Sequence, residues 1–224
     1  MKQLNGPFLL AVDDGYEASK PKVVVVGQEN NGWLECDYLA FLEASNIDQC
    51  LAVYRKFDIA EYGHGTFGRY FASLRQALHG QVTDSNRRSV MWTNLFKLNH
   101  KGQQTIYSPH LEAILAIQGN IVAQEIDILR PDVVIFLTGP RYDGIIRHAF
   151  PDAEFRAVNG HPVNELSHIS AGHLPALSFR TYHPAFLNRV RRTKRYCLQA
   201  IIDRVLDSFP LGDGRSSDPP TKPC

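Results

Sequence analysis

Four short apolar runs are the feature of this 224-residue sequence that most constrains its fold. The runs occupy residues 23–26, 90–93, 133–137 and 176–180. Each is rich in β-branched or aromatic residues and ends at turn-forming residues, a pattern typical of buried parallel strands. A chain with such runs has to cover both faces of one sheet.

Helical patterns lie between and after these runs. Apolar residues recur at a 3.6-residue period in 67–78, in 111–129 and in 193–209. The second segment has a start signal at Ser108-Pro109 and a stop signal at Arg130-Pro131. Strands that alternate with helices predict an α/β fold, a three-layer sandwich around a central, mostly parallel, four-stranded sheet.

Length and composition predict one domain. A chain of 25.2 kDa with 44% hydrophobic residues is long enough to build one sizeable core. Residues 34–62 are too long for an ordinary loop, so we expect a partly helical insertion there within a domain of residues 1–209. The Pro-, Gly- and Ser-rich segment 210–224 predicts a disordered tail.

The net charge and the cysteines exclude several classes of function. Twenty-four basic against 23 acidic residues give a charge of +1, so any nucleic-acid surface must be local. The cysteines form no CxxC pair, which argues against a zinc ribbon or an iron–sulfur cluster, and we expect neither metal nor cofactor. No apolar stretch approaches a membrane span, so we expect a cytoplasmic monomer without a membrane partner. The four cysteines are Cys36, Cys50, Cys197 and Cys224.

Polar residues follow each predicted strand. Ligands of open parallel sheets bind beyond the carboxyl ends of the strands. We therefore expect Gln28, Glu29, Asn94 and His183 to converge. The loop after the first strand has neither GxGxxG nor GxxxxGK[ST], which argues against a dehydrogenase and a nucleoside triphosphatase.

The segments VVVVGQENNGW, HGTFGRYFASLRQAL, WTNLFK and YHPAFL, in their order and strand-end placement, resemble motifs of the uracil-DNA glycosylase superfamily. The resemblance spans about residues 20–208. It implies that the chain flips a base out of DNA and hydrolyses its N-glycosidic bond. DNA would be its partner, held by the phosphate backbone and one flipped base.

Residue roles follow from this resemblance. Glu29 matches the acid that orients water, and His183 matches the histidine beside the base, so these two would be catalytic. Leu187 matches the wedge that fills the vacated base stack. A carboxylate and a donor would stabilise the sugar cation and the departing base anion. The implied base-binding residues are Gln28, Asn31, Phe67 and Asn94.

Three positions depart from the family's first motif. Glu29 stands where the water-activating members have Asp, and Asn30 replaces a Pro. Asn31 replaces the Tyr that blocks C5 of the pyrimidine in uracil-specific members. We therefore expect a C5-modified cytosine of phage DNA as substrate and a role in antiviral defence, with uracil removal in DNA repair as the alternative.

A basic segment follows the last motif. Phosphate contact beside the wedge would explain positive charge at a helix start, where the helix dipole disfavours it. A solvated helix end is the alternative. The residues are Arg189, Arg191, Arg192, Lys194 and Arg195.

Other interpretations stay open for the same residues. Phe67 and Leu187 also fit an apolar core, His183 a structural histidine, and Asn31-Gly32 a hairpin turn. A DNA- or partner-binding protein without catalysis is a second candidate. A metal-dependent hydrolase is a third, although no histidine pair has i,i+4 spacing; it would use His161, His168, His173 and His183.

Overall fold

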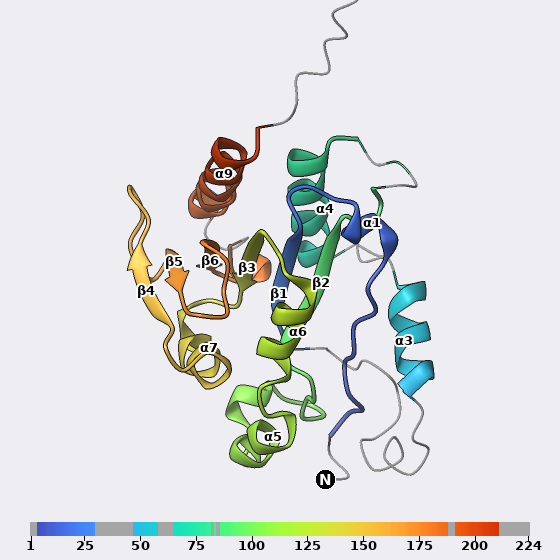
Figure 1. Ribbon diagram of the computed structural model, residues 1–224. Coiled ribbons are helices and arrows are strands. Elements are labelled where there is room, and N and C mark those ends of the chain that lie inside the picture. The colour runs from blue at the N-terminus through green and yellow to red at the C-terminus, as the bar shows by residue number, and fades with distance from the viewer. Residues whose placement is uncertain are drawn as a thin grey trace, which may run out of the picture.

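The computed structural model describes residues 4–29, 47–57, 65–81, 83, 86–187 and 191–210, with only the backbone of 187 and 191–196. Six strands form one sheet in the order β2-β1-β3-β6-β5-β4, which Figure 1 shows side by side. The strands are β1 Val23–Glu29, β2 Val90–Phe96, β3 Val133–Leu137, β4 Glu154–Ala157, β5 Leu166–Ser170 and β6 Leu177–Thr181.

The four predicted runs form β1, β2, β3 and β6, which pair in parallel with one another. The predicted four-stranded sheet is wrong, because β5 and β4 add two antiparallel strands and make the sheet mixed. These two strands read EFRA and LSHIS and are not continuous apolar runs. An antiparallel edge needs only one buried face, so it leaves a weaker apolar signal in the sequence.

Helices cover both faces of the sheet. On one face Val23 and Val25 pack with Leu74 of α4 and Ile201 of α9. On the other face Val24 packs in a second apolar cluster with residues of α1, α3, α5, α6 and α7. The α-helices are α1 Asp14–Glu17, α3 Ile47–Lys56, α4 Thr66–His79, α5 Leu111–Gln118, α6 Ile121–Leu129, α7 Asp143–Ala149, α8 Pro184–Leu187 and α9 Arg191–Ser208.

Helix positions agree with the sequence pattern except in one segment. The periodic residues of 67–78 and 193–209 lie in α4 and α9. The single helix expected over 111–129 is wrong, because Gly119, with φ of 52°, ends α5 and a new helix begins at Ile121. Glycine adopts this positive φ at little cost, while the apolar period continues across the break.

The insertion expected at 34–62 is described in part. Its residues 47–56 form α3, and residues 34–46 and 58–62 lie outside the described part of the chain, as do 211–224 of the expected tail. Two 3₁₀ turns complete the described elements, η1 Thr105–Tyr107 and η2 Pro140–Tyr142. None of the described helices has the length and apolar character that crossing a membrane requires.

Gly27 and Asn94 stand directly opposite each other on β1 and β2. A Cβ added at Gly27 would overlap the Asn94 side-chain oxygen and approach Trp92 Nε1 to 3.3 Å. The side chain of Asn94 therefore occupies the space that only a glycine leaves open on β1.

We predict that Gly27→Ala lowers the free energy of unfolding by about 1–3 kcal/mol, the usual cost of overpacking. Gly144→Ala is the matched control, because Gly144 lies in α7 with nothing within 4 Å of an added Cβ. This control should raise stability by up to about 1 kcal/mol. Denaturant unfolding measures both, and a Gly27→Ala protein as stable as the parent would contradict the contact with Asn94.

Candidate functional site

Two adjoining clefts lie at the carboxyl ends of β1, β3 and β6. Gln28, Gln104 and His183 line both clefts. Glu29 and residues 99–104, which follow β2, line the first cleft, which has a volume of about 610 Å³. Residues 138–142 after β3 line the second, together with Tyr182 and Phe186. Of the four side chains expected to converge, Gln28, Glu29 and His183 meet at this edge of the sheet, whereas Asn94 lines neither cleft.

Thr105 holds the carboxylate of Glu29. The backbone N–H of Thr105 donates to Glu29 Oε2 at 2.8 Å, and the Thr105 hydroxyl donates to the same oxygen. Thr105 is buried at the start of η1. Two charge-assisted hydrogen bonds from a buried residue fix the orientation of this longer acidic side chain.

Gln28 ties two strand ends together. Its Nε2 donates to the backbone carbonyl of Thr138 at 2.8 Å, which joins the end of β1 to the end of β3. This bond is structural and occupies one of the donors of the carboxamide. Gln28 still faces both clefts.

His183 stacks on Phe67. The ring centroids are 5.7 Å apart and the ring planes lie 25° apart. Burial lowers the pKa of His183 below its usual value, so the ring is neutral at pH 7. His183 Nδ1 accepts from the backbone N–H of Ala185 at 3.2 Å, so the neutral ring carries its proton on Nε2.

Asn94 is almost fully buried in β2, two residues before the strand ends at Phe96. Its Oδ1 accepts from Trp92 Nε1 at 3.3 Å, which sets the orientation of the carboxamide, because a flipped amide would place two donors together. Among the described residues, Nδ2 has no hydrogen-bond partner. A buried donor without a partner is costly, so Nδ2 is a group that an acceptor from outside the described residues would stabilise.

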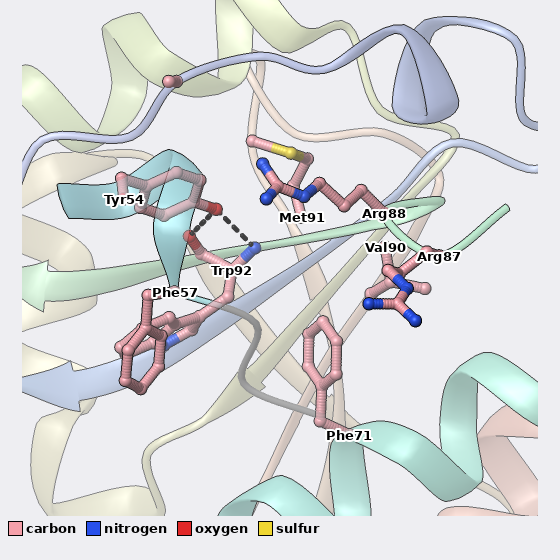
Figure 2. A pocket seen from close by; sticks show the side chains of 9 residues that line it. Tyr54, Phe57, Phe71, Arg87, Arg88, Val90, Met91 and Trp92 are labelled. Atoms are coloured by element: carbon pink, nitrogen blue, oxygen red, sulfur yellow. Dashed lines mark hydrogen bonds between the residues drawn. The ribbon is translucent and has the colours of Figure 1, made fainter. Parts of the chain in front are cut away.

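Trp92 connects Asn94 with Phe67 and the core. Its ring lies 5.9 Å from Phe67 and 4.7 Å from Phe8, measured between centroids. Figure 2 shows a small pocket that Trp92 and Tyr54 help to line. There the Tyr54 hydroxyl donates to the Trp92 carbonyl at 2.8 Å. The candidate site is therefore a row, His183 to Phe67 to Trp92 to Asn94, that begins in the clefts and ends in the core.

A buried ion pair lies on the other face of β2. Lys97 Nζ is 2.5 Å from Glu125 Oε2 of α6, and the Thr93 hydroxyl donates to the same oxygen at 2.7 Å. Burial lowers the pKa of Lys97, while the charge of Glu125 opposes that change. This cation is engaged away from the clefts and holds the end of β2 against α6.

Several expected site residues lie outside what the structure describes. Asn31 and Arg189 fall in segments that are not described. The basic residues of α9 and the last residue of α8 are placed by their backbone only: Leu187, Arg191, Arg192, Lys194 and Arg195.

The four histidines of the expected hydrolase site do not gather. His168 Nε2 contacts the carbonyl of Ala176, His173 contacts Asp127, and His183 stacks on Phe67. In the described segments, only His161 of these four belongs to a group of three potential metal ligands. Within the described residues, these four histidines therefore do not form one shared metal site.

Two residues of the site were missed in the sequence. Thr105 lies 76 positions from Glu29 and carries no motif, so no local signal identifies it. Trp92 lies in the quoted segment WTNLFK, but a tryptophan in a buried strand is first taken as core. The spacing of residues along the sequence does not predict that the Trp92 ring contacts both Phe67 and Phe8.

The chain matches no family model and no curated protein. The resemblance to uracil-DNA glycosylases therefore stays a prediction from four short motifs. A functional assignment has to be argued from the clefts and the side chains around them.

The lowered pKa of His183 predicts a pH effect on stability. In the unfolded chain His183 takes up a proton near pH 6.5. In the folded chain it takes up this proton only at a lower pH, because its pKa is lowered. The free energy of unfolding should therefore fall as pH drops from about 7.5 to 5.5, and fall less in His183→Gln. Urea unfolding at both pH values measures the difference.

His173→Gln is the matched control for this effect. A hydrogen bond to Asp127 raises the pKa of His173, so this residue stabilises the fold at low pH. Its removal should make the fall in stability steeper, opposite to His183→Gln. If the free energy of unfolding falls by the same amount in the parent and in His183→Gln, the burial of a neutral His183 ring is contradicted.

Proposed function

We propose that this chain is a DNA glycosylase that hydrolyses the N-glycosidic bond of a flipped base and leaves an abasic site. One observation carries the proposal: Glu29 and His183 line one cleft, and the row from His183 ends at Asn94 with its unpartnered buried donor. A carboxylate, a neutral imidazole, an aromatic ring and an amide donor are the groups that this reaction needs.

Glu29 would act on the sugar. Both Thr105 hydrogen bonds are made to Oε2, so Oε1 is the oxygen that we assign to the attacking water or the sugar cation. Because the carboxylate is fixed before the reaction, its charge stabilises the developing cation without reorganisation. The uracil-DNA glycosylase motif that this segment resembles has a shorter aspartate at this position. We infer that the two Thr105 hydrogen bonds hold the longer glutamate in place here.

His183 and Asn94 would act on the base. As negative charge develops on the departing base, the Nε2–H of a neutral His183 can donate to it. Asn94 Nδ2 requires an acceptor, such as O4 of uracil or N3 of cytosine. A base that stacks on the face of Phe67 now covered by His183 would have to displace the imidazole ring.

The substrate class that we propose is a C5-modified cytosine of phage DNA, which would make the chain an antiviral protein. This choice rests on Asn31, a small residue in place of the family's C5-blocking tyrosine. Incubation with hypermodified phage DNA and with uracil-containing DNA, followed by an assay for abasic sites, tests it. Abasic sites in uracil DNA alone would indicate repair, and DNA binding without abasic sites in either would indicate a non-catalytic binding protein.

Glu29→Gln tests the catalytic assignment. Glutamine is isosteric and can still accept both Thr105 hydrogen bonds, but it lacks the charge that stabilises the sugar cation. We predict that cleavage falls by about 100-fold or more while DNA affinity is retained. Single-turnover cleavage and binding measurements on the same preparation check both parts.

Glu154→Gln is the matched control, because Glu154 is an exposed residue of the edge strand β4 that lines neither cleft. It should leave cleavage unchanged. Near-full activity in Glu29→Gln would remove Glu29 from the mechanism.

The basic segment at the start of α9 tests DNA contact. Arg191→Ala with Arg192→Ala should weaken binding to all sequences alike and reduce the salt dependence by about one unit of slope per lost phosphate contact. Lys20→Ala is the control, because Lys20 is exposed and precedes β1, at the sheet edge opposite the clefts. An unchanged affinity and slope in the double variant would make the basic segment a solvated helix end.

A further inference from the structure

Three potential metal ligands lie together beside the start of α9. They are His161 and Glu165, in the connection between β4 and β5, and Cys197 of α9. Their ligand atoms all lie within 4.8 Å of one another. None of the three lines either cleft of the candidate glycosylase site, so a metal site at these residues is independent of the proposed function.

The distances fit a tetrahedral ion. Cys197 Sγ and His161 Nδ1 are 3.9 Å apart. A zinc ion with Zn–S of about 2.3 Å and Zn–N of about 2.0–2.1 Å places two such ligands about 3.6 Å apart at a tetrahedral angle. A shift of a few tenths of an ångström, within the reach of side-chain torsions, would bring Cys197 and His161 to this separation.

The backbone around the group is held in place. The N–H of His161 donates to the Val158 carbonyl at 2.9 Å, and the N–H of Glu165 donates to the Pro162 carbonyl at 2.9 Å. The Thr181 hydroxyl at the end of β6 donates to the Glu165 carbonyl at 3.0 Å. The ligands thus sit on a turn anchored to the sheet and on one long helix, which is the support that a metal site requires.

The donor set selects the class of ion. A thiolate, an imidazole and a carboxylate together suit zinc or another divalent transition metal and do not suit magnesium or calcium, which prefer oxygen ligands. Without metal, Cys197 Sγ contacts His161 Nδ1 at 3.9 Å, a separation within reach of a sulfur hydrogen bond. Binding of the ion would replace the thiol proton, which leaves to solvent, by a metal–sulfur bond.

We propose that His161, Glu165 and Cys197 bind one divalent transition-metal ion of the zinc class, with a fourth position left for water or another ligand. The ion would join the β4–β5 connection to α9. Because Cys197 lies close to the basic start of α9, the ion would also fix that segment next to the end of β6. The main effect of the ion would therefore be on stability. Because it binds the folded chain, it would raise the free energy of unfolding by mass action.

Cobalt binding tests the site directly. The full chain is stripped with a chelator and titrated with Co²⁺ alone, and the spectrum is read for a thiolate-to-cobalt charge-transfer band and for the visible bands of a tetrahedral ion. We expect one equivalent to bind with both signals, and Zn²⁺ to displace the cobalt. Zn²⁺ should also raise the midpoint of thermal unfolding of the stripped protein.

Variants assign the ligands. Cys197→Ser should abolish the charge-transfer band, and Cys50→Ser, a change at the buried cysteine of α3, should retain it. Glu165→Gln, at a partly exposed position where folding should tolerate the change, should weaken Co²⁺ affinity by about 10- to 100-fold or more. His168→Gln is its control, because His168 lies on β5 outside the group.

The proposal is overturned by any of three results. The parent shows no charge-transfer band, the band persists in a folded Cys197→Ser protein, or Glu165→Gln binds Co²⁺ as tightly as the parent. Should Cys197→Ser fail to fold by circular dichroism, Glu165→Gln decides the question through affinity. DNA cleavage is not part of this test, so a failure here leaves the glycosylase proposal untouched.

Discussion

Strand β1 is the constraint on which the rest of the structure depends. Its four valines, Val23 to Val26, are completely buried, and the strand is hydrogen-bonded to β2 on one side and β3 on the other. A strand with two apolar faces and two paired edges requires helices above and below it. Where this strand leaves the core, Gln28 and Glu29 enter the clefts, so the same element that organises the core also positions the candidate catalytic carboxylate.

Trp92 connects the apolar core with the candidate site. Its backbone is bonded to the Tyr54 hydroxyl of α3, and its ring contacts Phe8 on one side and Phe67 on the other. The indole N–H then orients Asn94. The orientation of Asn94 would thus depend on packing by Phe8 of the N-terminal segment and by α3.

Polar groups inside the molecule follow two different patterns. Two buried cations are paired with carboxylates: Lys97 with Glu125, and Arg180 with both oxygens of Asp143 at 3.0 and 3.1 Å. Leaving such a charge unpaired would cost several kcal/mol, so these pairs hold strands to helices. Asn94 differs from these cations, since its Nδ2 is one of eight buried side-chain atoms that have no hydrogen-bond partner within the described residues.

The sequence by itself determined the parallel strands and two of the three predicted helices, because continuous apolar runs and an apolar helical period record burial directly. It did not reveal β4 and β5, whose polar residues suit an edge of the sheet, or the break at Gly119, which the apolar period crosses.

Only the tertiary structure decided which side chains meet. Thr105 reaches Glu29 across 76 positions, and Cys197 reaches His161 across 36. Spacing along the chain holds no information about contacts that arise when a loop folds back over the end of a strand.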